Sequence, residues 1–306
     1  MKMAEARAKI TLKKILFATD FEALANQAMP FAVALANRYH AKLYAVHVIP
    51  RAAYAYGHPE LMERVLKEVY DYADCELSQI AGSLRQRGCP CEALLADGDP
   101  GEVITALAET HEADLIVVGT TSRGGVGKVL LGSVAEQVIR EALCPVLTVG
   151  SHVETDASVS IQTVLCAIDF SLESLRAAHF AFSFAQEYRA HITLLHVMEE
   201  DSGNAANPAK WQAQEQLHDL VPSDVDLPFP PQLMVTNGRP GECILGVARD
   251  LSADIIAIGV RGAGAFANTA SHFGSIAHKV LSGAQCPVLS AGAPRRQNIA
   301  QHKRRA

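Results

Sequence analysis

The sequence has no long apolar run and no excess of positive charge. Its apolar stretches fall well short of the roughly 20 residues that a membrane helix needs, so we expect no membrane span. No apolar segment of the secretory kind follows the charged N-terminus. Both absences favour a cytoplasmic protein. The net charge of −6 excludes a generally basic nucleic-acid-binding surface, and we expect no nucleic-acid partner.

Cysteine and tryptophan are also sparse. Seven cysteines, an odd number scattered over 306 positions, do not form a disulfide framework. Cys89 and Cys91 are close in sequence, but no Cys or His cluster lies near them, and we interpret both as ordinary thiols. Trp211 is the single tryptophan, and we expect it to pack the helix that carries it. Basic residues gather at both ends and are interpreted as solvated tails, with a nucleic-acid or membrane-surface role as the alternative.

The chain repeats itself once. Residues 14–21 return as 163–170, 98–102 as 238–242, and 144–147 as 286–289. The offsets of 149, 140 and 142 positions are far too long for a short-period solenoid. We therefore predict two homologous domains, 1–150 and 162–293, joined by a polar linker at 151–161 and followed by a basic tail at 294–306. The composition, 49% apolar, supplies enough material for two cores.

Each copy alternates short β-branched runs with helical patterns. In the first copy we predict strands near 13–19, 42–49, 91–96, 114–119 and 145–149, and helices near 22–39, 59–87, 101–111 and 133–142. The second copy repeats this, with a short helix near 209–220. The alternation predicts an α/β fold of two tandem Rossmann-like, doubly wound domains. Each has a five-stranded parallel sheet of order 3-2-1-4-5, flanked by helices.

Unusual residues fall where this order would bind a ligand. The order reverses between strands 1 and 4, and ligands bind at the carboxyl ends of the strands there. Asp20 closes strand 1, and a glycine-rich loop runs from Gly119 to the helix that begins after Gly132. Glycines and a helix N-terminus suit a phosphate, although a plain surface loop with a serine-capped helix is the alternative. The P-loop motif is absent, and the glycine spacing at 262–267 follows the wrong strand for a dinucleotide fingerprint.

Together these residues resemble the universal stress protein family. The shared motifs are the strand-1 Asp, His-Val on strand 2, Gly-x-Pro before the third helix, the loop Gly-x2-Gly-x9-Gly-Ser and the terminal Cys-Pro-Val-Leu. The resemblance covers nearly the whole chain as two tandem domains. In the first copy Ser122 takes the place of the second loop glycine. In the second copy eleven residues, without Lys or Arg, separate Gly262 from Gly274.

The resemblance implies an ATP-binding regulator of stress response, not an enzyme, with at most slow ATP hydrolysis. ATP, with or without Mg²⁺, is the expected cofactor. The binding positions carried over to the first copy are Asp20, Val48, Gly119, Ser122, Arg123, Gly132, Ser133 and Val134. The second candidate site comprises Asp169, Val197, Gly259, Gly262, Gly274 and Ser275. Because the second loop is longer and neutral, we expect weaker or absent ATP binding there.

Other readings remain open. The main alternative is a pseudo-symmetric scaffold that acts through protein partners without nucleotide. Asp20 and Asp169 could instead cap the following helices, and His47 and His196 are expected to be hydrogen-bonded near-core residues. The family commonly dimerises through its fifth strand. The resemblance therefore implies that strands 145–149 and 287–291 pair within the chain as an internal pseudo-dimer, with a homodimer as a further option.

Overall fold

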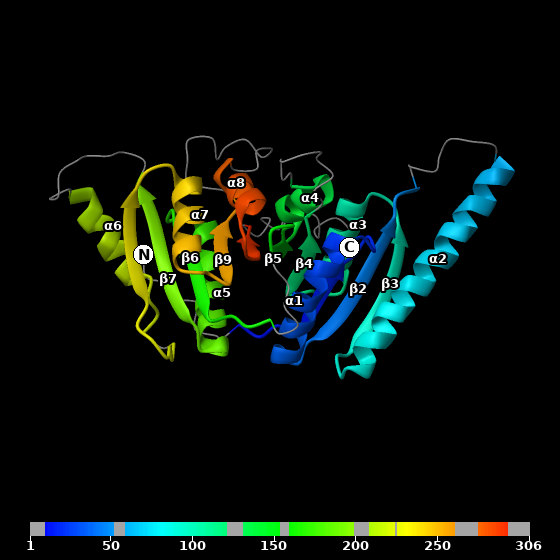
Figure 1. The fold of residues 1–306 in the computed structure, drawn as a ribbon, viewed down its shortest axis with the longest axis horizontal. Helices are drawn as coiled ribbons and strands as arrows, with labels where there is room; N and C mark the ends of the chain where they lie inside the picture. The colour runs from blue at the N-terminus through cyan, green and yellow to red at the C-terminus, as the bar shows by residue number, and fades with distance from the viewer. Residues whose placement is uncertain are drawn as a thin grey trace, which may run out of the picture.

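The computed structural model describes residues 10–51, 59–120, 131–153, 159–198, 208–223, 225–260 and 275–292, and shows two similar halves (Figure 1). The first half contains β1 (Lys14–Ala18), α1 (Ala23–Tyr39), β2 (Lys42–Ile49), α2 (Pro59–Gln86), β3 (Cys91–Asp97), α3 (Pro100–Thr110), β4 (Leu115–Gly119), α4 (Ser133–Glu141) and β5 (Val146–Val149). The second half contains β6 (Thr163–Ala167), α5 (Leu172–Tyr188), β7 (His191–Met198), α6 (Pro208–Asp219), β8 (Gln232–Asn237), α7 (Pro240–Asp250), β9 (Ile255–Gly259), α8 (Ser275–Gly283) and β10 (Val288–Ala291). The predicted first-half elements are confirmed to within one residue at each end. The bounds of the two domains, the linker and the tail stay predictions, since 154–158 and 293–306 lie outside the described residues.

The ten strands found among the described residues belong to one sheet. The order is β3-β2-β1-β4-β5-β10-β9-β6-β7-β8, so the predicted order 3-2-1-4-5 is confirmed in each half. Neighbouring strands are parallel within a half. Between the halves, β5 and β10 pair antiparallel, which confirms the expected pairing of the fifth strands inside the chain. The two predicted sheets are therefore continuous with each other.

The buried side chains form two clusters, one on each face of this sheet. Ile15 and Phe17 of β1 belong to the cluster covered by α1, α2, α5 and α6. Leu16 and Ala18 belong to the cluster under α3, α4, α7 and α8, as the alternation of side chains along a strand requires. Both clusters contain residues from both halves. The cores thus divide by sheet face instead of by domain, because the paired fifth strands carry each apolar layer across the junction.

A repeated acidic residue aligns the first strand of each half with the fourth. The Asp114 carboxylate accepts the main-chain N–H groups of Lys13 and Lys14 through Oδ2, at 2.7 and 2.9 Å. Asp254 does the same for Gln162 and Thr163, at 2.7 and 2.8 Å. These bonds tie the start of β1 to the start of β4 and of β6 to β9. The opposite, carboxyl ends of each strand pair, where the candidate sites lie, are brought level as a result.

One prediction about packing is wrong. The Trp211 side chain on α6 is 69% exposed. The buried residues of α6 are Ala213 and Leu217, one turn apart on one side, and a residue two positions before Ala213 points to the opposite side. The thiol interpretation is consistent with the structure, since all seven cysteines are free. Among the described residues no helix combines the length and apolarity needed to cross a membrane.

Candidate functional site

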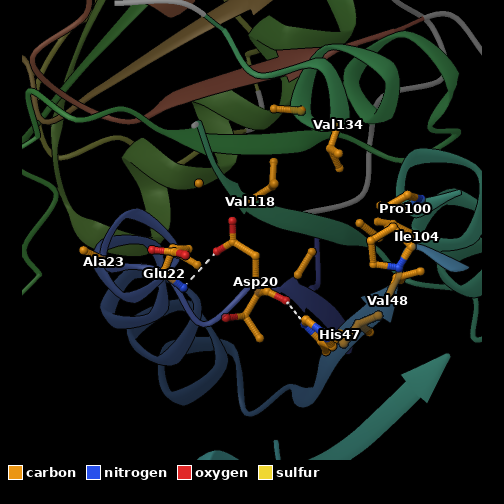
Figure 2. Close-up of a pocket in the computed structure, with 16 residues that line it drawn as sticks. Asp20, Glu22, Ala23, His47, Val48, Pro100, Ile104, Val118 and Val134 are labelled. Carbon is orange, nitrogen blue, oxygen red and sulfur yellow. Dashed lines mark hydrogen bonds between the residues drawn. The ribbon is translucent and has the colours of Figure 1, made fainter. Parts of the chain in front are cut away.

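A cavity of about 360 Å³ opens at the predicted switch point of the first half. It lies where the carboxyl ends of β1, β2 and β4 meet the starts of α1, α3 and α4 (Figure 2). Its volume falls in the range of roughly 300–1,000 Å³ that is usual for small-molecule sites. The lining residues are Ala18, Thr19, Asp20, Glu22, Ala23, Ala25, Val46, His47, Val48, Pro50, Pro100, Ile104, Val118, Gly119, Val134 and Ala135.

A tight turn after β1 holds Asp20 at the cavity. Asp20 Oδ1 accepts the main-chain N–H of Glu22 at 3.0 Å, and Thr19 Oγ1 accepts that of Phe21 at 3.0 Å. Phe21 adopts a left-handed conformation, with φ of 65°. Its ring stacks on His47 with 4.2 Å between centroids, and His47 Nδ1 lies 2.8 Å from the main-chain oxygen of Thr19. The turn is thus fixed from both sides, and Asp20 lies near the centre of the close-up, its carboxyl group toward Val118 (Figure 2).

These bonds also decide two of the alternative readings. The N-cap of α1 is Glu22, whose side chain makes no cap bond, so Asp20 stabilises the turn before the helix and does not cap it. In the second half the N-cap of α5 is Ser171, which accepts from Ser174, while Asp169 again bonds the preceding turn. The expectation that His47 is hydrogen-bonded and partly buried is confirmed.

The opposite wall of the cavity is apolar. Val48 of β2, Val118 of β4 and Ile104 of α3 are almost fully buried and face the same space as Val134 of α4. Figure 2 shows Val48, Ile104 and Pro100 close together on one side of the cavity. An apolar slot with a few polar groups at its rim suits a flat, mostly apolar ring system better than a sugar or a free anion.

The far end of the cavity leads toward a helix N-terminus. Gly119, the last residue of β4, lines the cavity, and α4 begins at Ser133 as predicted. Gly132 is the N-cap and supplies no side-chain cap bond, so the first N–H groups of α4 can bind an anion. Ser133 is exposed and is not among the lining residues. Ser122 and Arg123 lie outside the described residues.

The second candidate site has the same backbone plan with bulkier walls. Asp169 Oδ1 accepts from the main-chain N–H and the hydroxyl of Ser171, at 3.0 and 2.5 Å, and His196 Nδ1 lies 2.7 Å from the oxygen of Ile168. Val197 is the last residue but one of β7, as Val48 is of β2. Gly259 ends β9 and Ser275 begins α8, whereas Gly262 and Gly274 lie outside the described residues. The positions of Ala23, Val46, Val118 and Val134 are taken by Leu172, Leu195, Ile258 and Ile276. A Cβ on Gly259 would lie 2.7 Å from the main-chain nitrogen of Ser174, so β9 runs very close to α5.

Several lining residues were not predicted. Thr19, Glu22 and His47 flank predicted residues in sequence, whereas Pro100 and Ile104 come from a different helix. The Gly-x-Pro motif before that helix was the signal that could have located them. Within the described part of the chain no cluster of three or more His, Cys, Asp or Glu side chains could hold a metal ion.

Comparison with known proteins agrees with this geometry. The model of the "Universal stress protein family" matches residues 11–150 and 160–291. The chain belongs to the universal stress protein family. A universal stress protein from Methanocaldococcus jannaschii is 36% identical over 141 residues, which cover 45% of this chain and 81% of that one. One from Thermus aquaticus is 38% identical over 138 residues, or 45% and 98% of the two chains.

A solved structure matches the tandem arrangement. The crystal structure of a universal stress protein from Archaeoglobus fulgidus superposes with a TM-score of 0.70, covering 92% of this chain and 98% of that one. At 21% sequence identity this likeness shows the shared fold. The chain therefore has two tandem family domains in one α/β molecule.

Proposed function

We propose that this universal stress protein binds ATP in the cavity of the first half and acts as a nucleotide-dependent regulator of stress response. The observation that carries the proposal is the cavity itself. It combines an apolar slot, a carboxylate at the rim and, at the far end, a helix N-terminus to which the N-cap Gly132 gives no side-chain bond. An adenine ring, a ribose and a phosphate chain need these three environments, in this order along the cavity.

Each part of the nucleotide has a residue suited to it. Val48 and Ile104 would pack against the adenine ring, and the Asp20 carboxylate would accept hydrogen bonds from ribose hydroxyls. The phosphates would approach Gly132 and Ser133, with Ser122 and Arg123 proposed from the sequence alone. Mg²⁺ typically takes one or two carboxylates plus phosphate oxygens, and the two lining carboxylates, Asp20 and Glu22, would satisfy that need.

The second half is proposed to bind ATP more weakly or not at all. Leu195 and Ile258 are buried and each adds a methylene group where the first half has valine. Leu172 replaces an alanine at the mouth of the crevice. Larger side chains in the slot leave less room for an adenine ring, and the longer, neutral loop predicted from the sequence attracts phosphate less.

The chain is proposed to regulate by binding, with at most slow hydrolysis of ATP, and to work in the cytoplasm. The second candidate function is that of a scaffold that binds protein partners without nucleotide. The observation that favours the scaffold is the single ten-stranded sheet, which fixes the two halves as one body. A homodimer of whole chains is compatible with either function.

Two measurements test the proposal on the full-length chain. The first is mass spectrometry of small molecules released when freshly purified protein is denatured. The second is calorimetric titration with ATP, with and without Mg²⁺, of the wild type and three variants. Asp20→Asn and Gly132→Val alter the first-half site, and Asp169→Asn is the matched control in the second half.

ATP or ADP should be released by the wild type, with one tight site in the titration. Asp20→Asn should weaken binding at least tenfold, because the neutral amide is a poorer acceptor for ribose hydroxyls. Gly132→Val should weaken it further by blocking the approach to the helix N-terminus, and Asp169→Asn should leave the tight site unchanged. If no nucleotide is recovered and none binds on titration, the scaffold function replaces the nucleotide-binding one.

A further inference from the structure

The halves meet about an approximate twofold axis at which equivalent residues face each other. In the alignment of the repeat, residues 144–150 correspond to 286–292 and residues 14–49 to 163–198. Leu147 pairs with its own counterpart Leu289 in the β5–β10 ladder. The counterparts Thr148 and Ser290 each donate a hydroxyl hydrogen bond across the junction, to the oxygens of Val288 and Val146, at 3.1 Å in both cases. The axis therefore passes through the leucine pair.

The equivalent helices α4 and α8, which cover the same face of the sheet, are related by the same axis. A Cβ on Gly150 would lie 4.0 Å from the main-chain oxygen of Ala284, and one on Gly292 would lie 4.0 Å from that of Ala142. These four residues are two pairs of counterparts, so the C-terminal end of α4 approaches the second half as the end of α8 approaches the first. The main-chain surfaces that meet at the junction are nearly symmetric.

One pair of counterparts on the axis breaks this symmetry in charge. Arg38, near the end of α1, and Glu187, near the end of α5, occupy equivalent positions and form an ion pair with 3.0 Å between Nε and Oε1. Arg38 also donates through Nη2 to the main-chain oxygen of Glu187, and its guanidinium lies 5.4 Å from the ring centroid of Tyr188. The Glu187 side chain is 15% exposed. A charge this sheltered from water is screened little, so the sign of the charge opposite it matters.

Because this pair lies on the twofold axis, its charges distinguish the other half of the chain from a second copy of the same half. In a symmetric interface, a residue on the axis meets its own copy. Two first halves paired this way would place Arg38 against Arg38, and two second halves would place Glu187 against Glu187. The neighbouring aromatic contact is also asymmetric about the axis. Tyr39 lies 6.2 Å from Phe184, measured between ring centroids, and the first-half counterpart of Phe184 is Leu35.

We propose that Arg38 and Glu187 make the fifth-strand surface heterotypic: each half accepts the other half and rejects a copy of itself. The partner that fits the first-half surface is thus the second half of a chain of this sequence, by default its own. Opposite charges favour the unlike pair, and like charges oppose both like pairs, which is how charged residues give specificity at symmetric surfaces. This inference does not depend on nucleotide binding.

A stability cycle on the full-length chain tests the pair. Arg38→Glu and Glu187→Arg each place like charges on the axis, and the double variant restores opposite charges in reversed order. Each single variant should lower the folding constant by about tenfold, and the double variant should recover most of that loss. Lys42→Glu is the matched control, because it breaks the Lys42–Glu92 pair of 2.6 Å within the first half and away from the axis.

Co-refolding distinguishes heterotypic pairing from pairing of like halves. Wild type and the Arg38→Glu/Glu187→Arg variant, one of them isotope-labelled, are refolded together at high concentration, and two-chain species are weighed by native mass spectrometry. In heterotypic pairing, the first half of each chain pairs with the second half of the other, which puts like charges on both axes of a mixed species. Mixed species should therefore fall at least tenfold below the share of about 50% that random mixing gives. The two single variants, refolded together, should instead exceed that share, while wild type with Lys42→Glu should match it.

Two results would overturn the proposal. One is enrichment of mixed species of wild type and the double variant, because pairing of like halves would place opposite charges on both axes in that mixture. The other is a cycle in which the double variant is as unstable as the sum of the single losses. The cycle decides alone if the chains refold only as monomers.

Discussion

The two halves differ in how they begin an equivalent helix, and this difference predicts a stabilising substitution. The N-cap of α3 is Asp99, whose Oδ1 accepts the main-chain N–H of Glu102 at 3.1 Å. The N-cap of α7 is Arg239, which makes no side-chain cap bond. The two main chains nearly coincide, with φ and ψ of −74° and 121° at Asp99 and −79° and 116° at Arg239. Arg239→Asp should therefore install the missing cap without strain.

The size of the effect follows from three contributions. A side-chain cap stabilises a helix by about 1 kcal/mol. Removing a cation from the positive end of the helix adds about 0.3–1 kcal/mol. Against these stands the lost ion pair with Glu242, which spans 3.6 Å on an Arg239 side chain that is 85% exposed and contributes at most about 0.5 kcal/mol. The net gain in the free energy of unfolding is about 1 kcal/mol, or roughly 2–4 °C in Tm.

The assay is urea unfolding of the full-length chain, followed by circular dichroism at constant pH. Arg239→Ala removes the cation without adding a cap and should give less than half of the gain. Asp99→Arg, the reverse exchange, should cost a similar amount. If Arg239→Asp is no more stable than Arg239→Ala, the cap bond does not form at α7 and the inferred equivalence of the two helix starts is refuted.

Two further predictions follow. Asp114→Asn should destabilise the protein by about 1–3 kcal/mol in urea unfolding, because its charged carboxylate accepts two main-chain N–H groups at the start of β1; a change below about 0.3 kcal/mol would contradict this role. The hydrogen bond from Lys279 lowers the pKa of Glu242, so the stability that this pair contributes is fully present above the ordinary pKa of 4.5 and is lost as the pH falls through the lowered value. Glu242→Gln should flatten the acid side of the stability profile, and an unchanged profile would show that the pair contributes nothing.

The sequence predicted those features that depend on local pattern or on the repeat. Strand and helix positions follow from apolar periodicity. Asp20 and Gly119 could be placed together because one follows β1 and the other ends β4 at the switch point. The exposure of Trp211 could have been predicted from its offset to Ala213 and Leu217, but the prediction rested on residue type alone. The composition indicated enough apolar residues for two cores but not how the cores divide. That division follows the faces of the sheet, because the β5–β10 pairing joins the two halves.

The candidate site shows the same division. Its strand-end residues were predicted, whereas Ile104 and Pro100 reach the cavity from α3, which is distant in sequence. The bulkier Leu195 and Ile258 are visible in the sequence, yet their effect becomes clear only when the cavity shows that their counterparts line it. Side chains that shape a cavity from remote elements are chosen by packing, which leaves no short sequence motif.

The leucine pair at the centre of the β5–β10 ladder has a consequence for how such a protein can change. In a dimer of identical chains, any substitution near the axis enters twice and must be compatible with itself. Here Leu147 and Leu289 are encoded by separate codons. Each side of the junction can therefore mutate alone, and a later substitution on the other side can compensate for the change. The two candidate sites of the tandem chain can therefore change independently of each other, which is impossible in a homodimer encoded by a single repeat.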